Sequence, residues 1–357
     1  MKRALIVLLL LAVAGGLFAQ ISFGGHVRSG LVVAVPDEGD PAFGVYNPDP
    51  NNAFRFELNG AYTNADANAG ANLRFRMNET AWGGEYAYAW FKPLDILWLY
   101  GGKMDNNRWG TFGGYDASGD VGSPTGFHLR LDPVPGASLG VGIAPALVDG
   151  VWGEFADASY RFGVRYTASG LLDAAANIAY NGASEVTNAN AGVNILALAS
   201  AGFSRLAIDV AVRNLGDAFD TTGTFGVGPR IEFKVGDLSG GLRAQVYIPV
   251  VDGQDLDTAA TVWGSYPIGS ITARLGAGFE LKGGFKAANS TGTFDYREWD
   301  ALPKAIGGAD DPLVVVKPSL AFNIGGGTIE AGYSLMTQLG DDSATKHAIY
   351  TTFNVGF

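Results

Sequence analysis

The residues that most often carry enzyme chemistry are few in this chain and far apart. The three histidines, His26, His128 and His347, lack the spacing of a metal site and have no lipase-type serine beside them. No cysteine is present, so a thiol nucleophile and a disulfide framework are both excluded. The glycine runs are not followed by the Gly-Lys-Ser/Thr of a phosphate-binding loop. The sequence therefore predicts no enzyme, no cofactor and no resident metal.

Acidic residues offer a second kind of chemistry. The pairs Asp310-Asp311 and Asp341-Asp342 could hold Ca²⁺ or a lipid-bridging cation, but we favour the simpler interpretation of solvated loop charge. Without Lys2 and Arg3, 22 basic and 35 acidic residues leave a net charge of −13. A nucleic-acid partner would favour a basic surface, so none is expected.

The elements that would position any site are long, two-faced strands. Ile271 to Leu281 alternates apolar residues with Thr272, Arg274 and Glu280. Successive side chains of a strand point to opposite faces, so such a segment has one apolar face and one charged face. Segments of about ten residues with this pattern are typical of a membrane barrel, whereas strands of soluble proteins average five or six residues.

The connections between these strands alternate between tight and long. Tight turns such as Gly236 to Gly240 alternate with long segments such as Lys282 to Pro312. This pattern predicts an all-β, transmembrane, antiparallel up-and-down β-barrel with short periplasmic turns and longer extracellular loops. The count is about 18 strands, and 16 is the alternative because Ala191–Leu198 and Asp257–Tyr266 are weak. Leu171 to Ala179 and Asn194 to Ala201 are rich in Ala and Leu and could also form helix.

The two ends of the chain carry short motifs. Met1-Lys2-Arg3 and an apolar core precede Leu17-Phe18-Ala19-Gln20, which predicts a cleaved signal peptide over residues 1–19 and a barrel over residues 20–357. The last strand, Tyr350 to Phe357, alternates and ends on an aromatic residue. An export signal at one end and an alternating strand that ends on Phe at the other resemble the ends of bacterial outer-membrane β-barrel proteins of the porin type.

That resemblance implies location in the bacterial outer membrane and an assembly signal formed by Phe353, Val355 and Phe357. It also implies outer-membrane lipid, the barrel-insertion machinery and periplasmic chaperones as partners, with a homotrimer as one assembly. The same resemblance implies that the third long loop, Met104 to Ser123, narrows the channel, with Asp105, Arg108, Asp116 and Asp120 as constriction residues. An outward-facing surface loop and constriction by Lys282 to Pro312 are the alternatives.

Charge is sorted by strand face. An Arg facing lipid at the bilayer midplane costs about 2–4 kcal/mol, so charged residues opposite the apolar faces are expected to line a water-filled lumen. The predicted pore-lining residues are Arg28, Arg55, Glu57, Arg74, Arg76, Glu85, Arg130, Arg161, Arg165, Asp209, Arg213, Arg230, Glu232, Arg243, Arg274, Glu280 and Lys317, and Glu330 shares this pattern. Trp98, Tyr100 and Trp263 are expected in the aromatic girdle at the membrane interface, with Tyr62, Tyr160, Tyr247 and Tyr333.

Three functions remain open at this stage. A porin for passive diffusion of small hydrophilic solutes ranks first because it alone uses the lumen charges. A transporter of hydrophobic substrates, like the fatty-acid channels, is the second, although those carry an N-terminal hatch and here a strand starts near the predicted cleavage site. A structural or adhesive barrel with acidic loops is the third.

Overall fold

The computed structural model describes residues 19–36, 40–45, 54–78, 81–104, 125–148, 151–152, 154, 157–181, 185–198, 201–213, 215, 219–250, 256–281, 312–340 and 345–357. The predicted signal segment lies outside these residues except for Ala19, where the first strand begins. Among the described residues, no helix is long and apolar enough to cross a membrane.

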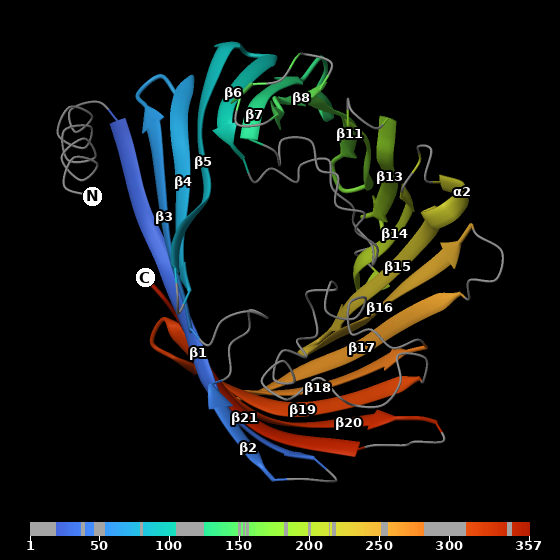
Figure 1. The fold of residues 1–357 in the computed structure, drawn as a ribbon. Coiled ribbons are helices and arrows are strands. Elements are labelled where there is room, and N and C mark those ends of the chain that lie inside the picture. The colour runs from blue at the N-terminus through green and yellow to red at the C-terminus, as the bar shows by residue number, and fades with distance from the viewer. Residues whose placement is uncertain are drawn as a thin grey trace.

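Eighteen long strands form the wall of the barrel, which Figure 1 shows as a ring. They are β1 (Ala19–Pro36), β3 (Phe54–Asn64), β4 (Ala69–Asn78), β5 (Ala81–Leu94), β6 (Leu97–Lys103), β7 (Thr125–Leu131), β8 (Ala137–Ala144), β11 (Ser159–Ala168), β12 (Leu172–Asn181), β13 (Glu185–Ile195), β14 (Phe203–Arg213), β15 (Thr224–Val235), β16 (Leu238–Pro249), β17 (Asp257–Ile268), β18 (Ile271–Glu280), β19 (Leu313–Ile324), β20 (Gly327–Gln338) and β21 (Thr345–Gly356). The short strand β2 (Ala42–Val45) pairs with β1 beyond the end of β3, β9 (Leu147–Val148) and β10 (Val151–Trp152) form a small hairpin, and α2 (Phe219–Thr222) is one turn.

The sheet closes on itself at β1. One edge of β1 pairs with β3 from Ala19 to Ser29, and the other pairs with β21 from His26 to Pro36. All other neighbouring wall strands are antiparallel and consecutive along the wall. Closure leaves the wall without the unpaired edge that hydrocarbon would not tolerate. The prediction of 18 strands is confirmed. Of the two weak segments, Asp257–Tyr266 lies wholly in β17, and Ala191–Leu198 lies in β13 up to Ile195.

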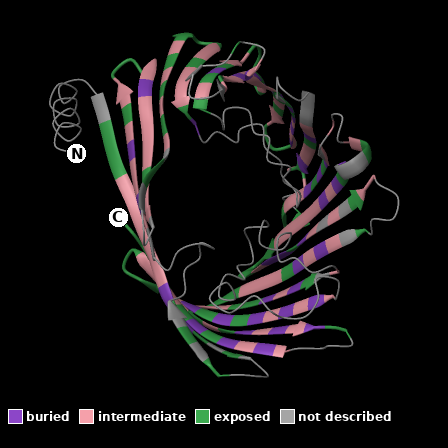
Figure 2. Ribbon diagram, in the orientation of Figure 1, coloured by how far each residue is buried: buried purple, intermediate pink, exposed green. Residues whose placement is uncertain are grey.

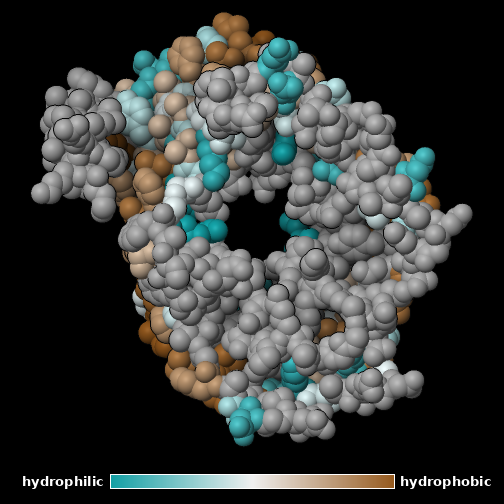
Figure 3. Space-filling view, in the orientation of Figure 1, coloured by the Kyte–Doolittle hydropathy of each residue, from teal (hydrophilic) through white to brown (hydrophobic). Residues whose placement is uncertain are grey.

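The two faces of the wall are opposite in character. The outward residues are exposed and apolar, as at Phe127, Val164 and Leu275. The inward positions include many buried polar or charged residues, such as Asp209, Lys317 and Ser334. Figure 2 shows buried and exposed bands alternating along β14 to β20, and Figure 3 shows hydrophilic residues beside the central opening with hydrophobic residues around the outside. An apolar exterior around a polar interior suits a wall surrounded by lipid.

The connections at the two ends of the barrel differ in length. At the end that holds Ala19 and Phe357, short turns join neighbouring strands, such as the two residues between β15 and β16. Gly236 lies in that turn with φ of 59°, a conformation that side chains with a Cβ rarely adopt. The long connections lie at the opposite end. That end also has two short connections, of two residues between β4 and β5 and of three between β12 and β13. The predicted alternation of tight and long connections is thus confirmed except at these two places.

A β-bulge changes which side chains of β5 point to the inner face. Arg74 pairs with Tyr86, whereas the next residue of β4, Phe75, pairs with Gly84. Glu85 is therefore an extra backbone residue, and it reverses the inward and outward alternation along β5. As a result Tyr86, Tyr88 and Trp90 share the face of Arg74, while Phe75 faces outward.

Candidate functional site

The inner face of the wall holds the charged residues that the alternation assigns to it. Fourteen of the predicted inner-face residues have described side chains, and each lies on the face opposite the exposed apolar residues of its strand. They are Arg28, Glu57, Arg74, Arg76, Arg130, Arg161, Arg165, Asp209, Arg230, Glu232, Arg243, Arg274, Glu330 and Lys317. The side chains of Arg55, Glu85, Arg213 and Glu280 lie outside the description, although their backbones belong to wall strands. Arg28 and His26 line a cavity of about 440 Å³ beside the turn at Gly325.

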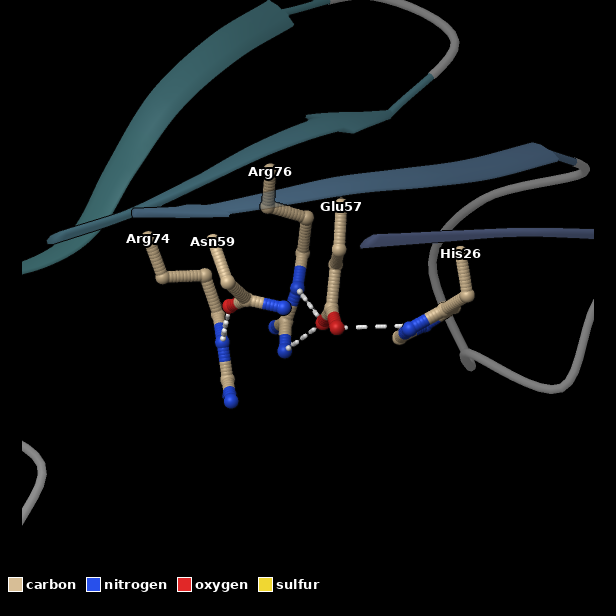
Figure 4. Close-up of polar contacts among 5 residues, drawn as sticks. All are labelled: His26, Glu57, Asn59, Arg74 and Arg76. Atoms are coloured by element: carbon tan, nitrogen blue, oxygen red, sulfur yellow. Dashed lines mark hydrogen bonds and ion pairs between the residues drawn. The ribbon is translucent and has the colours of Figure 1, made fainter. Parts of the chain in front are cut away.

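Glu57 is the centre of the charged cluster in Figure 4. One of its oxygens accepts hydrogen bonds from Arg76 Nε and Nη2 at 3.0 and 2.8 Å, and the other lies 3.1 Å from Nε2 of His26. Arg74, on the same strand as Arg76, donates to Oδ1 of Asn59 at 2.7 Å. Glu57 is only 2% exposed, so these donors compensate its buried charge.

Two further clusters use acids close to turns. Arg165 pairs with Asp173, which also accepts a hydrogen bond from the Thr167 hydroxyl at 2.9 Å. Arg130 donates to both oxygens of Asp132, at 2.8 and 2.5 Å. Asp132 and Asp173 are not among the pore-lining residues that the sequence predicted. Asp132 could have been found because residues two apart on an extended chain share a face.

The remaining clusters lie on β14 to β21. Glu232 pairs with Arg230 on its own strand, and Arg205 on β14 is 3.9 Å away. Glu330 accepts from Arg274 at 2.6 Å and from the Tyr350 hydroxyl at 3.2 Å. The ring of Tyr350 in turn lies 4.5 Å below the Lys317 ammonium. Two inner-face cations were not predicted from the sequence: Arg205, and the buried Lys346 of β21.

Aromatic residues occupy the inner face of β5, β6 and β7. The ring centres of Tyr86 and Tyr88 are 5.9 Å apart, those of Tyr88 and Tyr100 are 6.2 Å apart, and those of Tyr100 and Trp98 are 6.3 Å apart. Trp90 lies 5.4 Å from Trp98, and His128 stacks on Tyr100 at 5.1 Å. We call these six residues the aromatic ladder.

The ladder corrects the predicted girdle. Trp98 and Tyr100 alternate with Leu97 and Leu99, and Leu99 is the residue exposed on the outside. Trp263 is also inward, because its neighbour Val262 is exposed. Tyr62 and Tyr333 do lie on the outer face, whereas the side chain of Tyr247 lies outside the description. The sequence misplaced Trp98 because both faces of β6 are apolar.

Two of the three cations beside the ladder pair with acids. Arg130 lies 4.9 Å from the centre of the Trp98 ring and pairs with Asp132, and Lys92 lies 5.3 Å from that ring and 3.1 Å from Asp95. Arg74 lies 4.8 Å from the Tyr86 ring, within reach of Asn59. This part of the wall is therefore rich in aromatic surface while its charge is largely balanced.

The three histidines take different positions. His26 is in the Glu57 cluster, His128 is buried in the ladder, and His347 contacts the Tyr333 hydroxyl on the outer face. No group of three potential metal ligands occurs among the described residues. The arrangement offers ion pairs and rings along a wall, with no described constellation for bond-making chemistry.

The connection from Met104 is the third at the end that holds the long loops, between the fifth and sixth wall strands, as the sequence predicted. Its candidate constriction residues Asp105, Arg108, Asp116 and Asp120 lie outside the described residues. The same holds for residues 282–311, the alternative occluding loop.

The final strand covers the closure of the barrel. Phe353 and Val355 are exposed on the outer face, opposite Ser29 and Val27 of β1. The Phe357 ring stacks on Phe56 with centres 5.8 Å apart, and a Cβ added to Gly25 would lie 2.7 Å from this ring. The last residue therefore spans β1 and reaches β3.

Solved structures share this fold at low sequence identity. The chain resembles OpdL of Pseudomonas aeruginosa, with a TM-score of 0.55 and 11% identity over 95% of this chain and 99% of that one. For OpdQ of the same organism the TM-score is 0.55 and the identity 8%, over 95% of this chain and 98% of that one. For OccAB4 of Acinetobacter baumannii the TM-score is 0.52 and the identity 11%, over 96% of this chain and 99% of that one. No family model matches, and no curated protein is significantly similar in sequence.

These likenesses establish the architecture. The neighbours are bacterial outer-membrane β-barrel proteins, and the present wall has their closed antiparallel form together with an apolar exterior. The chain thus shares the closed antiparallel β-barrel fold of these proteins.

Proposed function

We propose that this protein is an outer-membrane channel through which small hydrophilic solutes diffuse passively. The observation that carries the proposal is the charged inner face of a closed, lipid-compatible wall. Paired side chains such as Arg165 with Asp173 and Arg274 with Glu330 are stable beside water and costly in an apolar conduit. A path for hydrophobic substrates would favour an apolar inner face, so the charges argue against that alternative.

The proposal assigns roles to the inner-face residues. The charged residues set the electrostatic field that a permeating ion meets, as rings of charge do in other pores. The 105–124 connection would narrow the path, with its acids facing arginines of the wall. No step of this function uses a cofactor, a metal or an enzymatic reaction.

The test is single-channel conductance of the refolded mature chain in a planar bilayer. Discrete, stable current steps are expected in potassium chloride. A heat-modifiable, fully folded barrel without current would favour a structural or adhesive role, in which case the acidic loops would be the functional surface. Native mass of the detergent-solubilised protein tests the homotrimer.

We also propose that Phe357, with Phe353 and Val355, forms the signal read by the barrel-insertion machinery after periplasmic chaperones deliver the chain. The position of the Phe357 ring over Gly25 supports an additional sealing role. Deleting Phe357 should cause periplasmic accumulation and degradation while synthesis is unchanged. Normal assembly of the deletion variant would contradict the signal role.

A further inference from the structure

We propose that the aromatic ladder on β5, β6 and β7 is a binding track for neutral linear oligosaccharides that pass through the channel. This inference rests on the proposed channel function and names a solute class for it. The ladder consists of Tyr86, Tyr88, Trp90, Trp98, Tyr100 and His128, all on the inner face.

The first argument is continuity. Each ring of the path from Tyr86 through Tyr88 and Tyr100 to Trp98 lies 5.9 to 6.3 Å from the next. Trp90, the register partner of Tyr100, lies beside this path and 5.4 Å from Trp98. A linear chain of pyranose rings offers apolar C–H surfaces at a similar repeat, so successive sugar units can contact successive aromatic rings. A ligand with a single ring would use only a fraction of this surface.

The second argument is access. The five Tyr and Trp side chains are only partly buried, so each retains surface on the inner face. The Trp90 ring leans across the wall over Gly70, because a Cβ added there would lie 2.6 Å from two of its ring atoms. The missing side chain at Gly70 is what allows this position. Gly140 and Gly142 of β8 pair with Arg130 and His128, so no side chain extends from β8 beside the ladder.

The third argument is charge. Three cations lie against the rings: Arg130 and Lys92 pair with Asp132 and Asp95, and Arg74 donates a hydrogen bond to the neutral amide of Asn59. An acidic solute would have to compete with these carboxylates, whereas a neutral one can use the guanidinium and hydroxyl donors without disturbing them. Aromatic surface with a few polar groups is the usual composition of a site for such a solute.

The experiment measures block of the single-channel current by maltohexaose and cellohexaose, with a hexagalacturonate as the acidic comparison. Neutral oligomers should reduce the wild-type current in a concentration-dependent manner. Trp98→Ala should raise the half-blocking concentration by about 2- to 12-fold, the range expected from loss of one aromatic contact. Trp98→Phe should recover most of the block because it restores a ring.

Trp263→Ala is the matched control. Trp263 is also inward and also leans over a glycine, since a Cβ at Gly241 would lie 2.5 Å from its ring, but it is not one of the ladder residues. This variant should leave the block unchanged. Every variant is first checked for heat-modifiable gel mobility and wild-type conductance, so a folding defect is recognised separately.

The outcomes separate the two proposals. If the channels conduct, three results would overturn the ladder proposal while the channel stands. They are a current that neutral oligomers never block, a current that only the acidic oligomer blocks, and a block that Trp98→Ala leaves unchanged. Absence of any current would overturn the channel. In that case a titration of the protein in detergent with maltohexaose, followed by tryptophan emission, still tests whether the ladder binds the sugar. Binding should alter the wild-type emission spectrum, and the double variant Trp90→Phe/Trp98→Phe should abolish that change.

Discussion

The inner wall has two parts that handle positive charge differently. On β5 to β7 the cations lie against aromatic rings and pair with acids in or beside turns, as Arg130 does with Trp98 and Asp132. On β11 to β21, and onward through β1, β3 and β4, they pair mainly with carboxylates of the strands, as Arg76 does with Glu57. We call these the aromatic wall and the ion-paired wall. The difference indicates that contact surface and electrostatic field are set by separate strands.

The largest effect is expected where the ion-paired wall is most buried. Glu57→Leu leaves Arg76 and His26 without their shared carboxylate, and breaking a buried pair from one side typically costs about 3–5 kcal/mol. The free energy of unfolding, measured by urea titration in lipid vesicles, should fall by that order. Glu57→Gln keeps an acceptor for Arg76 and should cost less. An unchanged unfolding midpoint for Glu57→Leu would show that water already solvates this cluster.

Selectivity should follow the ion-paired wall. Asp173→Asn and Glu232→Gln each remove one negative charge from the inner face, where Arg165 and Arg230 would remain. A charge about 8 Å from a permeating ion contributes about 0.5 kcal/mol in water, with opposite sign for an anion and a cation. The anion-to-cation permeability ratio should therefore rise about sixfold at low salt, and less where salt screens the charge. The reversal potential across a salt gradient measures this ratio.

The aromatic wall supplies the control for selectivity. Tyr88→Phe removes a hydroxyl and no charge, so its reversal potential should match the wild type. Twelve basic inner-face candidates against six acids favour a weak anion preference in the wild type. Equal shifts in Tyr88→Phe and Asp173→Asn would mean that the two walls are not electrically distinct.

Much of the fold could be predicted because a strand between lipid and water shows its two faces in its sequence. Ile271 to Leu281 alternates so regularly that only one orientation is compatible with lipid. Leu171 to Ala179 was ambiguous because Ala and Leu favour helix, and the hydrogen bonds of β12 to both β11 and β13 override that propensity. The connection from Met104 was also placed correctly between the fifth and sixth wall strands, since tight turns at the other end fix the strand count.

The aromatic ladder could not be predicted for two physical reasons. β6 reads Leu97-Trp98-Leu99-Tyr100, so hydrophobicity does not distinguish its faces, and only pairing with β7 shows that Trp98 is next to Arg130. The bulge at Glu85 reverses the alternation of β5, and a single sequence carries no signal for that extra residue. The pair of Arg165 and Asp173 joins neighbouring strands, so it too depends on register.

The smallest effect is expected where ring and charge meet in the ion-paired wall. The Tyr350 hydroxyl donates to Glu330 at 3.2 Å, while its buried ring lies over Gly332 and beneath Lys317. Tyr350→Phe keeps the ring and removes one hydrogen bond to a carboxylate that Arg274 still neutralises. The free energy of unfolding should therefore fall by about 1 kcal/mol, with no shift in reversal potential. Tyr350→Leu, which also removes the ring beneath Lys317, should cost about 0.5–2 kcal/mol more. Equal losses for the two variants would show that the hydroxyl alone matters, and that a ring against a cation contributes to stability only in the aromatic wall.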